Sequence, residues 1–265
     1  MKAFFISIPH SGERIPPEAT WLNGLPEPVV MCDVDRYVDR LYEPIVKDLK
    51  LACVKTVWHR YVIDLNRLAE DVDCDSVEGH QNPSGKFPMG LHWVQTTTGL
   101  QLMKAPISQG LHRQFVQRYF EPFHSDVRDT YSFFRERGAE KIYHLDAHSM
   151  PSLGTKAHRD PGQYRADIVI SDWEGKACEP KFKELVGEAY KQAGLRVAFN
   201  WPYLGGRVTQ TYGRPEQGQH AIQVEINRAL YMNEETKQII PEKAKVLSDQ
   251  LSKAIRMIYD QVSDI

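Results

Sequence analysis

Residues 142–149 read IYHLDAHS, a short apolar run that ends in an aspartate, a histidine and a serine. The run predicts a buried strand over Ile142–Asp146. Asp146 and His148 lie two residues apart, so their side chains share one face of that strand. The same pattern stands at the start of the chain, where an expected strand over Ala3–Ile8 leads into a histidine. Polar residues at strand ends are typical of ligand sites in open α/β sheets.

Outward from these two strands, apolar runs alternate with amphipathic stretches, which is the pattern of a layered α/β domain. No linker or repeat interrupts it, so we expect one domain over residues 1–265. Two stretches, 70–98 and 151–165, are rich in turn residues and predict long loops. The remaining strands are predicted at Cys53–Trp58, Tyr61–Leu65, Ile168–Ser171, Val197–Phe199 and Ala221–Ile226, and the helices from Asp35 to Leu49, over 111–137 with a break near Pro122, over 180–193 and after Pro241.

Composition narrows the class of protein. The 265 residues are 42% hydrophobic, and the 26% that are charged nearly cancel to a formal net charge of -2. This balance argues against nucleic-acid and membrane-surface binding, which favour a basic patch. No apolar run is long enough to span a bilayer, and the four cysteines form no CxxC pair. We therefore expect a cytoplasmic protein with reduced thiols.

Two histidines and one of two aspartates are candidate metal ligands. Zinc enzymes commonly combine two histidines with one carboxylate and leave a position open for water. His10 and His148 follow the two strands described above, and Asp33 and Asp35 stand just before a predicted helix. Either aspartate is equally suited to cap that helix. We favour Asp35 as the third ligand, with Asp33 as the alternative.

Further polar side chains suit catalysis and substrate binding. Glu225 interrupts an apolar strand, where a carboxylate is costly unless it is used or projects outward into water. Beside a metal it can act as general base and acid. Arg60, Asn66 and Arg67 flank another apolar run, and guanidinium groups bind carboxylates bidentately. The glycine pair before Arg207 would let the backbone approach a ligand closely.

Taken together and in this order, six segments resemble the N-formylglutamate amidohydrolase family. They span most of the chain, whereas 70–98 and 151–165 match less clearly. The segments are IPHSG (8–12), DVDRYVDRLY (33–42), RYVIDLNR (60–67), LDAHS (145–149), YLGGRVTQTYGRP (203–215) and QVEINRALYM (223–232).

The resemblance implies hydrolysis of N-formyl-L-glutamate to formate and L-glutamate, a late step of bacterial histidine catabolism. It implies a single-domain three-layer α/β/α fold with a mixed, mostly parallel sheet, similar to zinc carboxypeptidases. His10, one aspartate of the 33–35 pair and His148 would hold zinc, although other divalent transition metals suit such ligands. Glu225 would be the catalytic carboxylate.

The resemblance also implies a substrate site. Asn66 and Arg67 look like a clamp for the carboxylate of a small N-acyl amino acid, with Arg207 or Arg214 assisting. The family pattern requires no acid at position 13, so Glu13 stays outside the ligand set. Hydrolysis of another N-acyl amino acid or short peptide, and a catalytically silent binding protein, remain the alternatives. The sequence does not indicate an oligomeric state.

Overall fold

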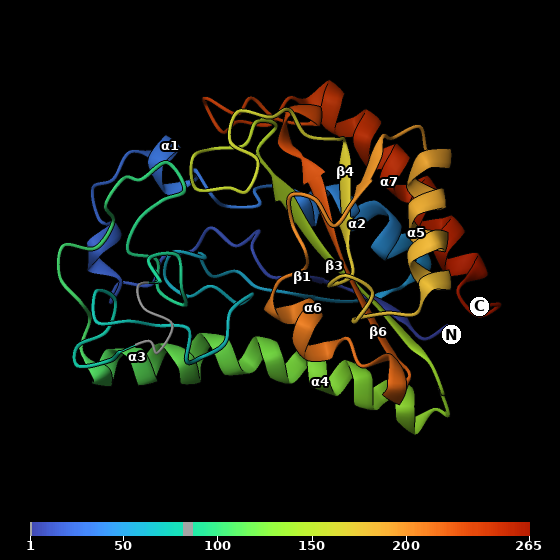
Figure 1. The fold of residues 1–265 in the computed structure, drawn as a ribbon, viewed down its shortest axis with the longest axis horizontal. Helices are drawn as coiled ribbons and strands as arrows, with labels where there is room; N and C mark the ends of the chain where they lie inside the picture. The colour runs from blue at the N-terminus through green and yellow to red at the C-terminus, as the bar shows by residue number, and fades with distance from the viewer. Residues whose placement is uncertain (1, 82–86) are drawn as a thin grey trace.

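A six-stranded sheet forms the centre of this computed structural model, which describes residues 2–81 and 87–265 (Figure 1). Its strands are β1 (Phe4–Ile8), β2 (Ala52–Lys55), β3 (Ile142–Met150), β4 (Ile168–Ser171), β5 (Val197–Phe199) and β6 (Gln219–Asn227). They are ordered β2-β1-β3-β6-β4-β5. Every neighbouring pair is parallel except β4 and β6. The predicted mixed, mostly parallel sheet is confirmed.

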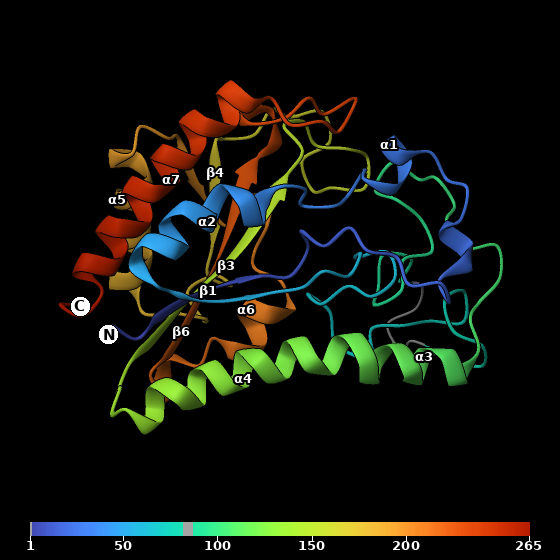
Figure 2. The same ribbon diagram turned by 180° about the vertical axis from the view of Figure 1, so that it is seen from behind.

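Helices cover both faces of the sheet and complete the predicted three layers (Figures 1 and 2). On one face lie α2 (Val38–Leu49), α5 (Pro180–Gln192) and α7 (Pro241–Gln261), and on the other lie α4 (Glu121–Glu136) and α6 (Arg207–Tyr212). The remaining helical segments are α1 (Glu27–Val30), α3 (Gln109–Phe115), a π-helical turn over Val116–Phe120 and short 3-10 turns at Thr20–Leu22, Pro215–Gln217 and Arg228–Leu230.

The central strand β3 shows how the sequence separates the two faces. Tyr143, Leu145 and Ala147 belong to the apolar core under α2, α5 and α7. Because side chains alternate along a strand, His144, Asp146 and His148 point to the α4 side, and all of β3 is buried. The sheet therefore carries a polar face that is shielded from solvent.

The part of the chain that connects β2 to α3 forms an irregular lobe beside the sheet (Figure 1). Its described residues contain isolated bridges but no strand or helix. Leu91 and Leu102 of this lobe pack in one apolar cluster with Phe115 at the end of α3. The predicted loop over 70–98 lies here, and residues 82–86 of it are outside the described part of the chain.

One predicted strand is absent, and two others end three or four residues away from the predicted end. Tyr61–Leu65 forms no strand: single backbone bonds join it to residues 91–93, so its apolar pattern reflects burial in the lobe. The strand expected over Cys53–Trp58 ends at Lys55. The strand expected to end at Asp146 continues to Met150 because β6 pairs with it throughout.

Two predicted helices are present but differ from the prediction in where they begin or break. The helix expected from Asp35 begins at Val38, with Tyr37 as N-cap at a φ of 70°, so neither aspartate caps it. The expected break near Pro122 is a π-helical turn just before it, and the chain stays helical across it.

All four cysteines are free, and among them only Cys178 is buried. Among the described helices, none combines the length and apolarity needed to cross a membrane.

Candidate metal centre and substrate pocket

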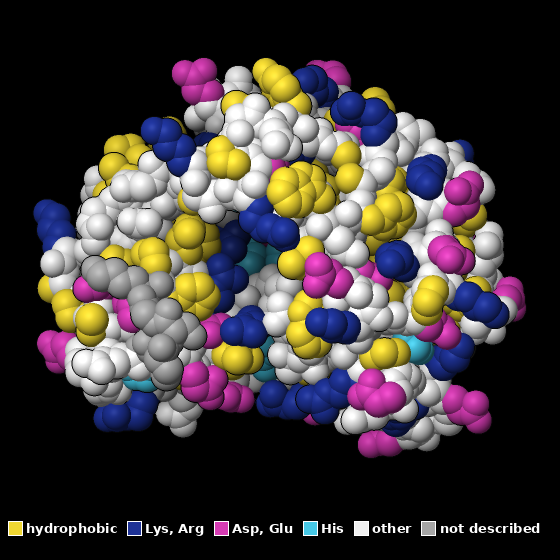
Figure 3. Space-filling model, viewed as in Figure 1, with side chains coloured by type: hydrophobic (Ala, Val, Ile, Leu, Met, Phe, Trp, Pro, Cys, Tyr) yellow, Lys and Arg dark blue, Asp and Glu magenta, His cyan; other side chains and the backbone are white. Residues whose placement is uncertain are grey.

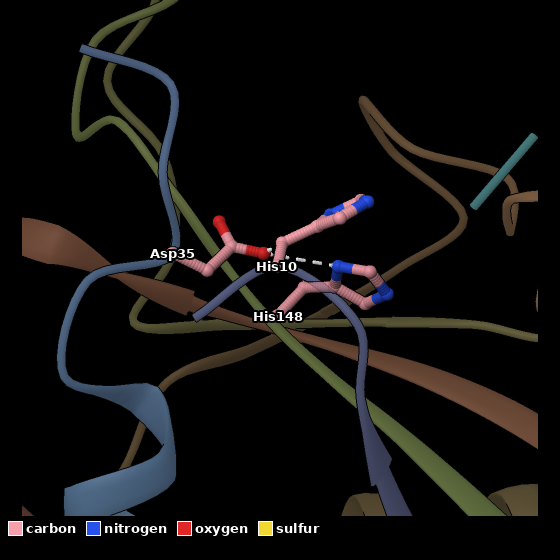
Figure 4. A group of neighbouring side chains, drawn as sticks. All are labelled: His10, Asp35 and His148. Carbon is pink, nitrogen blue, oxygen red and sulfur yellow. Dashed lines mark hydrogen bonds and ion pairs between the residues drawn. The ribbon is translucent and has the colours of Figure 1, made fainter. Parts of the chain in front are cut away.

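His10, Asp35 and His148 converge at the carboxyl ends of β1 and β3 (Figure 4). All three side chains are buried, and their candidate ligand atoms lie within 4.8 Å of one another. Asp35 Oδ2 is 3.4 Å from His10 Nδ1 and 3.0 Å from His148 Nδ1. Ligand atoms of a tetrahedral zinc ion lie about 3.3 Å apart. The three donors could therefore hold one metal ion.

A buried atom without a partner also fits a metal. His10 Nδ1 makes no hydrogen bond to any described residue, although it is shielded from solvent. Buried polar atoms are normally paired, so an orphan of this kind needs a ligand or an ion. A divalent cation held by Nδ1 of both histidines and by Asp35 would satisfy it.

The backbone brings these ligands together. Ser7 of β1 pairs in register with Asp146 of β3, so the chain three residues on places His10 beside His148. The backbone N–H of Asp35 donates to the carbonyl of His10 at 3.0 Å, which fixes the loop that carries the carboxylate.

Each histidine is oriented by a second carboxylate. His10 Nε2 is 2.7 Å from Asp64 Oδ1, and His148 Nε2 is 2.7 Å from Asp146 Oδ2. Since a carboxylate accepts, each Nε2 carries the proton and each Nδ1 faces the centre. Such carboxylate–histidine pairs are the usual support of histidine metal ligands.

The carboxylates and histidines of this cluster shift one another's pKa values. Burial would raise the pKa of Asp35, but the two histidines that face its carboxylate, His10 and His148, hold that pKa well below its ordinary value. Burial would lower the pKa of His148, but Asp146 and Asp35 raise that pKa well above its ordinary value. Without metal, His148 is therefore an imidazolium between two carboxylates, and a cation would take the place of its Nδ1 proton.

Asp33 lies apart from this cluster. Its carboxylate accepts hydrogen bonds from Tyr61 Oη at 2.6 Å and from Thr97 Oγ1 at 2.5 Å. These bonds turn it toward the lobe, although it still lines the cavity. Of the two aspartates left open by the sequence, the structure thus brings Asp35 to the histidines.

Glu225 stands opposite His148 in the pairing of β3 with β6. Its side chain is 5% exposed, so the outward projection considered as an alternative is wrong. Burial raises the pKa of Glu225 to about 7. Gln223 Nε2 donates to Glu225 Oε1 at 2.8 Å and fixes the carboxyl group at the cavity wall. A carboxyl group tuned in this way can both accept and return a proton near neutral pH.

A cavity of about 260 Å³ connects the metal cluster with Glu225, Arg60, Asn66 and Arg67. Figure 3 shows the surface hollowed at one place, with basic and histidine side chains inside. Arg207 does not line this cavity; it pairs with Asp71 at 3.2 Å. Glu13 likewise pairs with Arg36 at 2.8 Å.

No role was predicted from the sequence for Asp64 or Arg228. Asp64 accepts from His10, Arg60, Trp93 and the backbone of Asn66. An aspartate amid the apolar run YVIDL was a usable signal, because a buried carboxylate must be paired.

Arg228 follows the strand that carries Glu225, and its Nη2 donates to Asp35 Oδ1 at 3.1 Å. It also donates to Ser149 and to backbone carbonyls of the 32–33 segment. Arg228 therefore holds the carboxylate of Asp35 in place. Nothing in its spacing along the chain indicated this contact.

Comparisons with known proteins identify the family of this chain. The model of the N-formylglutamate amidohydrolase family matches residues 2–232. An N-formylglutamate deformylase from Pseudomonas putida is 29% identical over 86% of this chain and 81% of its own length. The deformylase from Pseudomonas aeruginosa is 28% identical over 87% of this chain and 82% of its own.

Two solved structures share the fold. An N-formylglutamate amidohydrolase from Ralstonia eutropha JMP134 has a TM-score of 0.86 and 24% identity, covering 98% of this chain and 95% of that one. A gene product of Agrobacterium tumefaciens has a TM-score of 0.68 and 18% identity, covering 97% and 91%. Because the family model matches most of its length, the chain belongs to the N-formylglutamate amidohydrolase family.

Proposed function

We propose that this protein is a zinc-dependent amidohydrolase that cleaves N-formyl-L-glutamate to formate and L-glutamate. One observation carries the proposal: His10, Asp35 and His148 form a buried donor set in the same cavity as Glu225. The matching Pseudomonas relatives are named N-formylglutamate deformylases, which supports the substrate.

His10 Nδ1, Asp35 Oδ2 and His148 Nδ1 would hold the ion. A bound zinc ion supplies a Lewis acid that polarises the substrate carbonyl and lowers the pKa of water. Cobalt, manganese or iron would suit the same donors, so the identity of the metal is part of the proposal.

Glu225 would move the proton. Its carboxylate takes a proton from the attacking water as the new bond to the formyl carbon forms. It then gives that proton to the nitrogen of the departing glutamate. Burial raises the pKa of Glu225 above that of an ordinary carboxyl group, which favours the return of the proton in the second step.

Arg67 and Asn66 would bind the substrate carboxylate. The Arg67 side chain is 21% exposed, and two of its nitrogens are fixed by the carbonyls of Met89 and Asn66. Nη2 lies 3.8 Å from Asp64 Oδ2, beyond hydrogen-bond distance, so it is the nitrogen left to bind a substrate carboxylate. Asn66 Oδ1 accepts from the backbone of Val208 at 2.8 Å, so its Nδ2 is the group able to donate to a carboxylate.

We propose for Arg60 a role other than the substrate contact expected from the sequence. It lines the cavity, but its Nη1 and Nη2 donate to the carbonyl of Asp33 and to Asp64 Oδ2. We assign it to holding these two residues in place. Cytoplasmic localisation, expected from the composition, and a role in histidine catabolism, implied by the family resemblance, stay predictions.

The test is formate release by the purified protein from N-formyl-L-glutamate, beside N-acetyl-L-glutamate and a short peptide. We expect the formyl substrate to have the highest kcat/KM. The variant Glu225→Gln should lose about 10²–10⁴-fold in kcat while it keeps its zinc content. Preferred turnover of the peptide or the acetyl compound would contradict the assigned substrate. Loss of zinc in Glu225→Gln would contradict the assigned role of the carboxylate.

A further inference from the structure

A chain of hydrogen bonds runs from the candidate metal centre through the interior on the α4 side of the sheet. Beyond His148 and Asp146, Ser7 Oγ lies 2.5 Å from Asp146 Oδ1. His144 Nε2 lies 2.7 Å from Ser7 Oγ, and Tyr131 Oη lies 3.1 Å from His144 Nδ1. The chain thus joins β3, β1 and α4.

The direction of each bond follows from the chemistry of the groups. Asp146 is a carboxylate and accepts, so Ser7 must give it its only proton. The Ser7 oxygen then accepts from His144 Nε2–H. Burial lowers the pKa of His144 to about 4, so its ring is neutral and Nδ1 accepts from the Tyr131 hydroxyl. All donors therefore point toward Asp146.

The surroundings hold this order in place. Ser7, His144 and Asp146 have no exposed surface, and Tyr131 is 4% exposed. The ring of Phe5 stacks on His144 with centroids 4.1 Å apart and meets Tyr131 edge-on at 5.1 Å. Water is thereby kept from the chain. A buried hydrogen-bond network of this kind is costly to break at any member.

We propose that Ser7, His144 and Tyr131 are positioning residues for the metal centre. They fix the carboxylate of Asp146, which keeps the His148 proton on Nε2 and leaves Nδ1 to face Asp35. This inference rests on the proposed function, because it assigns these residues to the binding of the same zinc ion. Metal-binding histidines usually have a carboxylate partner, and the proposal adds residues that hold this carboxylate in turn.

The test compares zinc affinities, measured by competition with a fluorescent chelator. Ser7→Ala removes the donor to Asp146, and Tyr131→Phe removes only the outermost hydroxyl. We expect zinc affinity to fall about tenfold in Ser7→Ala, the lower end for partners of a metal ligand, and less in Tyr131→Phe. Ser7→Thr keeps the hydroxyl and should restore most of the affinity.

Tyr42→Phe is the matched control. The Tyr42 hydroxyl is fully buried and lies 2.8 Å from that of Tyr190, on the opposite side of the sheet. Its removal breaks a buried hydrogen bond without touching the chain, so stability should fall and zinc affinity should not. If Ser7→Ala and Tyr131→Phe change zinc affinity no more than Tyr42→Phe, the three residues are merely structural and the inference is wrong.

One further variant, His148→Ala, distinguishes failure of this inference from failure of the proposed function. His148→Ala removes a proposed ligand itself and should lower zinc affinity far more than Ser7→Ala. A large loss in His148→Ala with no loss in Ser7→Ala would overturn only the inference. Undiminished zinc affinity in His148→Ala would overturn the metal centre, and the inference with it.

Discussion

Replacing Asp64 by asparagine tests how firmly the metal centre is supported. Each carboxylate oxygen of Asp64 accepts two hydrogen bonds: Oδ1 from His10 Nε2 and the backbone of Asn66, Oδ2 from Arg60 Nη2 and Trp93 Nε1. Asparagine has one oxygen, so either orientation of its amide leaves two buried donors facing an NH₂ group. A buried unsatisfied group costs about 1–3 kcal/mol. The free energy of unfolding should therefore fall by about 2–6 kcal/mol.

Urea denaturation of the zinc-free protein measures this loss, and chelator competition measures zinc affinity. We expect zinc affinity to fall about 10–100-fold, because His10 loses the partner that orients its ring. Asp249→Asn, which breaks only an exposed pair with Lys245, should change stability by less than about 0.5 kcal/mol. A loss below about 1 kcal/mol in Asp64→Asn, with zinc affinity unchanged, would refute the reasoning.

The remaining predictions concern activity and metal content. In a pH–rate profile, kcat should fall as the pH drops through the pKa of Glu225, because only the ionised carboxylate accepts a proton. This pKa is about 7 before metal binds and lower beside a cation. A profile that is flat from about pH 5 to pH 8 would contradict the role of Glu225. Arg67→Ala should raise KM about 10–150-fold by loss of a charged hydrogen bond, whereas Arg207→Ala should stay within about twofold; equal effects in steady-state assays would disprove the assignment. Asp35→Asn should lose bound zinc and Asp33→Asn should retain it, as metal analysis of the purified variants would show, and the opposite outcome would exchange their roles.

Residue patterns were sufficient to predict the sheet and the main helices. The apolar runs of β1 and β3 are clear because both strands are buried along their whole length, and the helical pattern of α7 is clear because one face of that helix is buried. Tyr61–Leu65 was misassigned because an apolar run buried in an irregular lobe has the same composition as a strand. The β-propensity of the residues alone does not distinguish a buried irregular segment from a strand.

The site was only partly predictable. His10, His148 and Glu225 stood out because polar groups at strand ends or within apolar strands are costly unless used. The spacing of Asp33 and Asp35 along the chain did not show which of them is the ligand. The structure distinguishes them by the turn at Tyr37 and by the hydrogen bond that Thr97 of the lobe donates to Asp33. The contacts of these groups with Asp64 and Arg228 join segments far apart in the chain. Such contacts depend on the fold and have no local pattern.

The metal centre is tested most directly by formate release from N-formyl-L-glutamate, using protein stripped of metal with a chelator and then reloaded. Stripping should abolish turnover. About one zinc ion per chain should restore turnover in the wild-type protein but not in His148→Ala. Full turnover by the stripped protein, or restoration by zinc in His148→Ala, would contradict a zinc centre at His10, Asp35 and His148.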